Sequence, residues 1–306
     1  GTHVTSKLDV EGADLKGIIS CLDFLREANI GKRENLKGKK VMVIGGGNTA
    51  MDASRTALRL GAEKVTVIYR RSRSEMPCFK PEIDEAEEES VEIMVLRNPI
   101  KFFGEDGILK KVQLIKMKLG EPDQSGRRRP EPIPGSEYIE EVDFVIEAIG
   151  LQPSTSMFGN TIEIKKGGTI KVNETTLQTS VESIFAGGDS VTGASTIIEA
   201  AGQGKKAAFY IDKYLQNLPL NNYVFGDKLP AIDKNKVLER GTFKLIPQVD
   251  PKFRNIHERI QDFKDVELTL SEEEVLLSTN RCLDCSNCRE CHQCVSACPA
   301  NAIDFS

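Results

Sequence analysis

Three consecutive glycines that join an apolar segment to a helix-like segment are well suited to hold a phosphate. Residues 40–51 read K-V-M-V-I-G-G-G-N-T-A-M. Gly45 permits a tight turn, Gly47 lets a pyrophosphate approach the backbone, and Ala50 lets the helix pack closely on the strand. Free N–H groups at the helix start favour an anion. Glycine-rich turns also close ordinary strands. The residues that we expect to bind a dinucleotide here are Gly45, Gly47, Asn48, Thr49 and Ala50.

Arginines follow the second expected strand, at the position where a dinucleotide-binding site contacts the ribose. The expected strand 64–69 ends in Arg70 and Arg71, with Arg73 close behind. Sites that prefer NAD usually place an acid at this tip, whereas guanidinium groups suit a 2′-phosphate. A solvated basic loop is the alternative interpretation. The position directly after a strand favours NADPH over NADH.

Six of the eight cysteines crowd near the end of the sequence, which favours a metal centre in a reducing compartment over disulfides. The last four precede Pro299 and match the C-x2-C-x2-C-x3-C-P run of bacterial ferredoxins. Zinc sites usually separate two C-x2-C pairs by a longer insert. We expect one 4Fe–4S cluster, because two clusters would need eight thiolates or other ligands. The candidate ligands are Cys282, Cys285, Cys288, Cys291, Cys294 and Cys298.

A second glycine-rich turn follows a short apolar segment at 183–189, which reads S-I-F-A-G-G-D. It places the carboxylate of Asp189, after Gly188, where a ribityl or ribose hydroxyl could be held. A simple turn is the alternative interpretation. A helix is expected over 193–214, and its first residues, G-A-S-T, include Thr196.

The elements that must position these residues alternate as in an α/β fold. Strands are expected at 41–44, 64–69, 91–96 and 142–149, the last closing at Gly150. Helices are expected from about residue 49 to Gly61 and over 81–90, with antiparallel strands across 102–119, a loop at 121–136 and helical packing over 253–277. The expected parts are 1–36, 37–150, 151–215, 216–280 and 281–306.

Composition places the chain among ordinary globular proteins. Of 306 residues, 39% are hydrophobic and 28% are charged, and the net charge of −5 does not suggest a nucleic-acid partner. No apolar run approaches the roughly 20 residues that span a bilayer, so no membrane span is expected. Together with the crowded cysteines, this predicts the cytoplasm.

With these three sites in view, the sequence resembles the family of the glutamate synthase small subunit, which includes NADPH-dependent ferredoxin oxidoreductase subunits. The matching motifs are I-G-G-G-N-T-A-M-D (44–52), V-T-V-I-Y-R-R (65–71), E-M-P (75–77), E-A-I-G (147–150), A-G-G-D (186–189), G-A-S-T (193–196) and R-C-L-D-C (281–285). The resemblance implies an NADPH domain inserted into an FAD domain. It implies that Gly150 lies near the nicotinamide, that Asp189 meets the FAD ribityl–phosphate region, and that the helix near Thr196 points its N-terminus at the flavin ring.

Two departures from the family pattern matter. Its first G-x-G-x-x-G, which grips FAD, is not found before Lys40, so the chain is expected to begin inside the FAD domain. The cysteine run is C-terminal, whereas the family's usual iron–sulfur ligands lie upstream of the FAD domain. We therefore expect an oxidoreductase, or part of one, that passes electrons between NADPH, FAD and a 4Fe–4S cluster to a protein partner. The alternatives are a non-catalytic electron-transfer or docking module and a dithiol reductase of the thioredoxin-reductase type.

Overall fold

The computed structural model describes residues 1–32, 35–122, 126–226 and 247–280. The chain divides into two compact units. The first comprises residues 1–226 with 256–264, and the second comprises 227–255 with 265–306.

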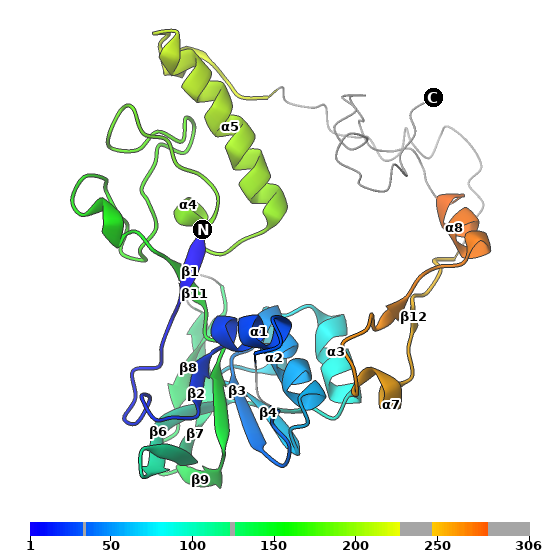
Figure 1. The fold of residues 1–306 in the computed structure, drawn as a ribbon. Helices are drawn as coiled ribbons and strands as arrows, with labels where there is room; N and C mark the ends of the chain where they lie inside the picture. The colour runs from blue at the N-terminus through cyan, green and yellow to red at the C-terminus, as the bar shows by residue number, and fades with distance from the viewer. Residues whose placement is uncertain (33–34, 123–125, 227–246, 281–306) are drawn as a thin grey trace. The chain divides into compact units, whose positions relative to one another are not determined.

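The first unit contains a five-stranded sheet, of which β2, β3 and β4 are labelled in Figure 1. All neighbouring strands are parallel, in the order β2-β10-β3-β4-β5. Its strands are β2 (Ile18–Ser20), β3 (Lys40–Ile44), β4 (Lys64–Tyr69), β5 (Glu92–Val95) and β10 (Phe144–Glu147). Buried apolar runs such as Val41–Ile44 are typical of a parallel sheet covered on both faces. The predicted α/β class and the four predicted strands are confirmed.

The sheet also includes β2. This strand lies before residue 37, the predicted start of the nucleotide-binding part. β2 leads directly into α1 (Cys21–Asn29) and pairs with β10 from far along the chain, as in the register pair Ile18 and Val145. Three residues with no turn signal of their own gave no periodicity from which to predict this strand.

Helices cover one face of the sheet. α1, α2 (Asn48–Arg59) and α3 (Lys80–Glu88) share one hydrophobic core with Val41, Val43, Val65 and Val67. The small residues of α2 that face this core, Ala50, Ala53 and Ala57, are fully buried. They allow the close helix–strand packing that the glycine pattern predicts.

An antiparallel sheet covers the other face. Its strands are β6 (Arg97–Glu105), β7 (Ile108–Pro122), β8 (Arg128–Pro132) and β9 (Tyr138–Glu141), and β7 pairs with all three others. Phe102, Leu109, Val112 and Leu114 pack on the sheet residues Met42, Ile44 and Ile68. The prediction of a continuous loop at 121–136 is wrong. β8 tolerates its prolines because it is an edge strand, and its partner β7 is unusually long.

Downstream of the parallel sheet, β11 (Leu151–Pro153) pairs antiparallel with β1 (Thr2–Thr5). A short helical turn, η2 (Ser156–Phe158), follows. Two single bridges come next along the chain, Ile164 with Ile170 and Gln178 with Phe185. α4 (Asp189–Thr192) and α5 (Ile197–Leu215) come next, so the predicted helix begins four residues late, and η3 (Leu220–Asn222) ends this part.

The predicted helical packing over 253–277 is only partly right. α7 (Ile256–Arg259) belongs to the first unit. In the second unit, β12 (Lys252–Phe253) pairs with β13 (Glu267–Leu268), and α8 (Glu272–Thr279) follows. The sequence spacing of Ser271 and Glu274 is that of a capping box, and the structure contains this box at the start of α8. Among the described residues, no helix combines the length and the apolar character needed to cross a membrane.

Candidate nucleotide-binding site

A cavity of about 420 Å³ lies at the carboxyl ends of β3, β4 and β10. Ligands of open α/β sheets bind outside this edge. The cavity brings together six residues that the sequence singled out from three separate segments. These are Gly45, Gly47, Thr49, Arg70, Arg71 and Gly150.

The three glycines of the turn meet different surroundings. A Cβ atom at Gly45 would lie 2.2 Å from the Ala148 carbonyl oxygen, and the φ of Gly45 is +150°. At Gly46 it would lie 2.5 Å from the Tyr69 ring. At Gly47 it would meet no described atom within 4 Å. Gly45 and Gly46 therefore serve close packing, and only Gly47 leaves open space beside the backbone.

Gly47 is the N-cap of α2 and provides no capping side chain. The first N–H groups of an uncapped helix are donors for an anion. The side chain of Asn48 has a structural contact instead. Its Oδ1 accepts the Phe79 N–H at 2.9 Å and connects the loop before α3 to the glycine turn. Ala50 is fully buried. Asn48 and Ala50 thus shape the turn, whereas Gly47 and Thr49 line the cavity.

The arginines after β4 differ in the same way. Arg70 is exposed and lines the cavity. Arg71 also lines it, but it is only 5% exposed and its Nε donates to the Arg128 carbonyl oxygen at 2.8 Å. Arg73 forms ion pairs with Glu87 and Asp84 of α3. Of the three arginines, Arg70 is the one presented to a ligand without a described partner.

Several cavity residues were missed from the sequence because they come from segments without a nucleotide motif. Arg97 begins β6, Arg127 precedes β8, and Cys21 begins α1. Only the folding of the antiparallel sheet onto the parallel one brings two more arginines to the cavity.

Glu147 is another cavity residue, at the end of β10. Its side chain is buried and accepts the Leu8 N–H at 2.9 Å. Burial raises the pKa of this carboxyl, and the Leu8 hydrogen bond and the Lys7 charge oppose the rise only in part. The contact joins the segment after β1 to the strand that ends beside Gly150.

The two described cysteines are unsuited to thiolate chemistry. Cys21 donates from Sγ to the Thr49 carbonyl oxygen at 3.3 Å. Burial, with a smaller contribution from Asp52, raises the pKa of Cys21 to about 12. Burial, then Glu82 and Asp52, raises the pKa of Cys78 to about 11. A redox thiol needs a lowered pKa, so neither favours a dithiol reductase.

A second hollow, of about 460 Å³, gathers the residues expected near FAD. Gly188, Asp189 and Thr196 line it together with one face of α5 that includes Ile197, Ala200 and Gly204. Gly188 has φ +67°, a conformation that favours glycine, and its N–H donates to Gln203 Oε1 at 2.7 Å. The two glycine-rich turns thus line two separate hollows.

The polar groups of this second hollow are already engaged in part. Asp189 accepts hydrogen bonds from Thr2 Oγ1 at 3.2 Å and from the Ser195 N–H at 3.3 Å. Thr196 caps α5 and forms a capping box with Glu199, which also accepts from Ser195 Oγ. The start of α5 therefore carries its own carboxylate, while Asp189 still presents acceptor capacity.

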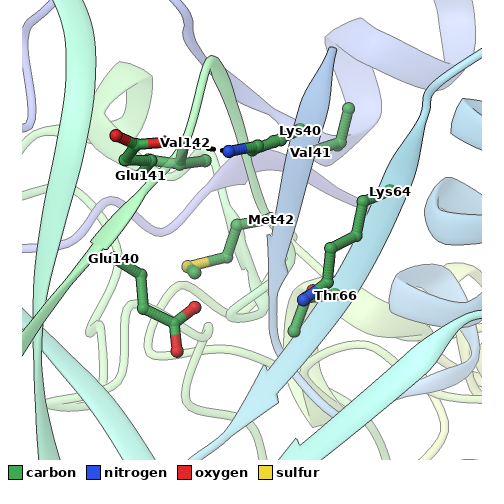
Figure 2. Close-up of a pocket in the computed structure, with 8 residues that line it drawn as sticks. All are labelled: Lys40, Val41, Met42, Lys64, Thr66, Glu140, Glu141 and Val142. Carbon is green, nitrogen blue, oxygen red and sulfur yellow. Dashed lines mark hydrogen bonds and ion pairs between the residues drawn. The ribbon is translucent and has the colours of Figure 1, made fainter. Parts of the chain in front are cut away.

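A further hollow lies at the opposite edge of the parallel sheet (Figure 2), where β3 and β4 begin. Lys40 pairs with Glu141 at 2.9 Å. Lys64 pairs with Glu92 at 2.8 Å. The amino ends of parallel strands are not where α/β folds bind nucleotides. This hollow is therefore not the candidate site.

All six candidate iron ligands, Cys282 to Cys298, lie outside the described residues. Within the described ranges, no group of three or more metal-binding side chains is found.

The sequence of residues 3–204 matches the family model described as pyridine nucleotide-disulphide oxidoreductase. Among curated proteins, the chain is similar to the NADP(+)-dependent formate dehydrogenase subunit beta of Moorella thermoacetica, at 42% identity over 93% of this chain and 41% of that protein. It is 37% identical to the NADPH-Fe(3+) oxidoreductase subunit beta of Geobacter sulfurreducens, over 93% of this chain and 47% of that one. The glutamate synthase [NADPH] small chain of Halomonas elongata is 38% identical, over 70% of this chain and 48% of that one.

The expected resemblance to the glutamate synthase small subunit is thereby confirmed, and the chain spans about half the length of these relatives. Among solved structures, Mycobacterium tuberculosis FprA in complex with NADPH superposes with a TM-score of 0.58 at 17% identity, over 72% of this chain and 62% of that one. T. acidophilum thioredoxin reductase superposes with a TM-score of 0.54 at 23% identity, over 71% of this chain and 64% of that one. These likenesses confirm the predicted fold, which the chain shares with the two structures over about 70% of its length. The chain belongs to the pyridine nucleotide-disulphide oxidoreductase family of enzymes.

Proposed function

We propose that the chain is the part of an NADPH-dependent oxidoreductase that binds NADPH and sends its electrons, through FAD and a 4Fe–4S cluster, to a partner subunit. The observation that carries this proposal is the cavity that joins Gly47, Arg70 and Gly150 at one edge of the sheet. The uncapped start of α2 suits the pyrophosphate of NADPH, the cation after β4 suits the 2′-phosphate, and the glycine after β10 suits the nicotinamide.

The proposal assigns roles to four residues that line the cavity. Gly47 and Thr49 bind the pyrophosphate through backbone N–H groups, and Arg70 binds the 2′-phosphate. Gly150 has φ +115°, and a Cβ atom there would meet no described atom within 4 Å, so the position leaves room for the nicotinamide. In the second hollow, Gly188, Asp189 and Thr196 hold part of FAD.

The bound cofactors supply the redox chemistry, as hydride from NADPH and single-electron transfer by FAD and the cluster, and the chain supplies binding and orientation. Alignment matters more here than a side-chain acid or base, so no catalytic residue is assigned. Crowded cysteines favour a reducing compartment, and we place the reaction in the cytoplasm.

The coverage of the relatives supports a partner other than the glutamate-forming subunit. The formate dehydrogenase and iron-reductase subunits align with 93% of this chain, whereas the glutamate synthase small chain aligns with 70%. Both of the former are named as beta subunits. We therefore assign the chain to the electron-transfer subunits of multi-subunit enzymes and leave glutamate synthesis aside.

Titration of the full chain with NADPH, followed by nucleotide fluorescence, tests the proposal. The wild type should bind NADPH at least about tenfold more tightly than NADH. Arg70→Gln should weaken NADPH binding by about tenfold or more, the size expected for a lost charge-assisted contact. Arg129→Gln is the matched control, because Arg129 is exposed and does not line the cavity. Equal, negligible binding by all three proteins would refute the proposal.

A further inference from the structure

The cavity residue Arg127 lies next to the antiparallel sheet and outside the βαβ unit of β3, α2 and β4. It immediately precedes β8, whereas the two arginines that the sequence singled out follow β4. We propose that Arg127 is the second cation of the 2′-phosphate site and that buried Arg71 acts as the residue that positions it. The inference rests on the proposed NADPH binding and adds a specificity residue to that site.

The backbone of Arg128 is fixed to the tip of β4 from two sides. Its carbonyl oxygen accepts from Arg71 Nε at 2.8 Å, and its N–H donates to Glu75 Oε1 at 3.0 Å. Its own guanidinium pairs with the same Glu75 oxygen at 3.0 Å. Because neighbouring Cα atoms are only about 3.8 Å apart, these bonds also hold Arg127 beside the β4 tip.

Glu75 is itself anchored to that tip. Its Oε2 accepts from the Ser72 N–H at 3.2 Å and from Ser72 Oγ at 2.8 Å, and Ser72 follows directly after Arg71. Partial burial opposes ionisation, but the hydrogen bonds from Ser72 and Arg128 outweigh it and lower the pKa of Glu75 to about 2. Glu75 therefore stays ionised at neutral pH, and its carboxylate joins Ser72 to Arg128.

The charge of the ligand calls for a second cation. A phosphate monoester carries a charge of about −1.5 to −2 near pH 7, and Arg70 supplies one positive charge. Arg71 is 5% exposed with its Nε on a backbone carbonyl, so its geometry fits a support for Arg128. Arg127 is half-buried and lines the cavity.

Arg97 is the other arginine that lines the cavity, and its hydrogen bonds connect parts of the two sheets. Its guanidinium donates to Tyr138 Oη at 3.1 Å and to the Leu96 carbonyl oxygen at 2.9 Å. These bonds tie the β5–β6 junction, where Leu96 has φ +55°, to β9. Arg97 therefore holds the junction of the two sheets.

The test compares NADPH and NADH binding by the full chain and by variants of the segment that leads into β8. Arg127→Gln should raise the dissociation constant of NADPH by about tenfold or more and leave that of NADH within about twofold. Arg129→Gln removes the same charge from a neighbouring exposed position that does not line the cavity, so it should change neither constant. Arg127→Lys should recover part of the preference for NADPH, because it keeps the charge.

The positioning role of Arg71 is tested by a double-mutant cycle. Arg71→Lys keeps the charge but loses the planar Nε donor to Arg128, so it should weaken NADPH binding. In the Arg127→Gln background it should have little further effect on the NADPH-to-NADH ratio, because both changes act on one contact. Additive effects would show that Arg71 contacts the phosphate directly and would overturn the positioning role.

The outcomes separate this inference from the proposed function. An NADPH-selective wild type whose Arg127→Gln variant keeps its selectivity would overturn the inference alone. Equal weakening of NADPH and NADH would also overturn it, since the contact would then be to a shared part of the nucleotides. A wild type that binds neither nucleotide would overturn the proposed function and this inference together.

Discussion

At the scale of single residues, the atoms around each glycine decide what that glycine does. Gly45 and Gly46 lie against Ala148 and Tyr69, whereas Gly47 faces open space. The glycine pattern predicted that Gly45 makes the tight turn and that Gly47 leaves room for a pyrophosphate, but it could not predict which atoms surround each glycine. Ala148 follows β10 and Tyr69 ends β4, and both strands become neighbours of β3 only in the sheet.

Gly47→Ala should therefore impair nucleotide binding without unfolding the chain. Its φ of −92° suits any residue, and the added methyl would occupy the space that a pyrophosphate needs. We expect NADPH affinity to fall by about tenfold or more with little change in the thermal midpoint, as measured by fluorescence titration and thermal denaturation.

Gly45→Ala is the contrasting variant. Its methyl would clash with the Ala148 carbonyl, and we expect a loss of about 1–3 kcal/mol in the free energy of unfolding. An unchanged affinity in Gly47→Ala, or a fully stable Gly45→Ala, would contradict this division of roles.

Glu147 gives a pH-dependent prediction at the same scale. Burial raises its pKa above the usual 4.5, so the folded state binds the proton more tightly than the unfolded state. The stability it contributes is fully present below the unfolded pKa and is lost as the pH rises through the folded pKa. Glu147→Gln, which still accepts the Leu8 N–H, should therefore gain stability relative to wild type as the pH rises above 4.5 in denaturation experiments. A pH-independent difference would contradict this.

At the scale of elements, a buried ion-pair network joins α2, α3 and α7. Glu89, which directly follows α3, is fully buried and pairs with Arg55 at 2.8 Å and Arg59 at 2.8 Å. Arg259 of α7, 1% exposed, has its Nε 3.0 Å from Glu89 Oε1, without hydrogen-bond alignment, and pairs with Glu88 at 2.9 Å. Residues 256–264 are thereby anchored to the helices of the first unit.

Glu89→Gln should be strongly destabilising, because it leaves buried guanidinium groups without a full counter-charge. We expect a loss of about 3–5 kcal/mol in the free energy of unfolding, measured by denaturant titration. Glu163→Gln is the control, since both side chains of its ion pair with Lys171 are exposed, and it should cost less than about 1 kcal/mol.

The pH dependence of this network has the opposite sign to that of Glu147. Burial opposes ionisation of Glu89, but hydrogen bonds from Arg55 and Arg59 outweigh it and lower its pKa. Its stabilising contribution is present above the unfolded pKa and is lost as the pH falls through the folded pKa. Glu89→Gln should therefore abolish part of the acid sensitivity of the wild type. Equal acid sensitivity in both proteins would contradict the network.

At the scale of the whole molecule, the cysteine run predicts an iron–sulfur centre that the described residues do not include. Anaerobically purified protein should contain about four irons per chain, the content of one 4Fe–4S cluster, and show a broad absorption shoulder. Cys288→Ala with Cys291→Ala should lose the iron, whereas Cys21→Ala should keep it because Cys21 is buried beside Thr49. Full iron in the double variant would refute the assigned ligands.

Much of the fold followed from local patterns. Strands 41–44 and 64–69, the helix between them and the capping box at Ser271 are encoded by residues close in sequence, so periodicity and capping chemistry predict them. The strand β2 was not predicted because its partner β10 lies far along the chain. The edge strand β8 was not predicted because its prolines indicate a loop.

The sequence by itself determined the family, the nucleotide turn, the basic tip of β4 and the cysteine run, because each is a contiguous motif whose chemistry depends on spacing. Only the tertiary structure decided that Arg71 supports Arg128 and that Arg127 and Glu147 reach the same cavity as Gly47. These contacts join segments separated by long stretches of chain. They arise from the packing of one sheet on another, which no local pattern encodes.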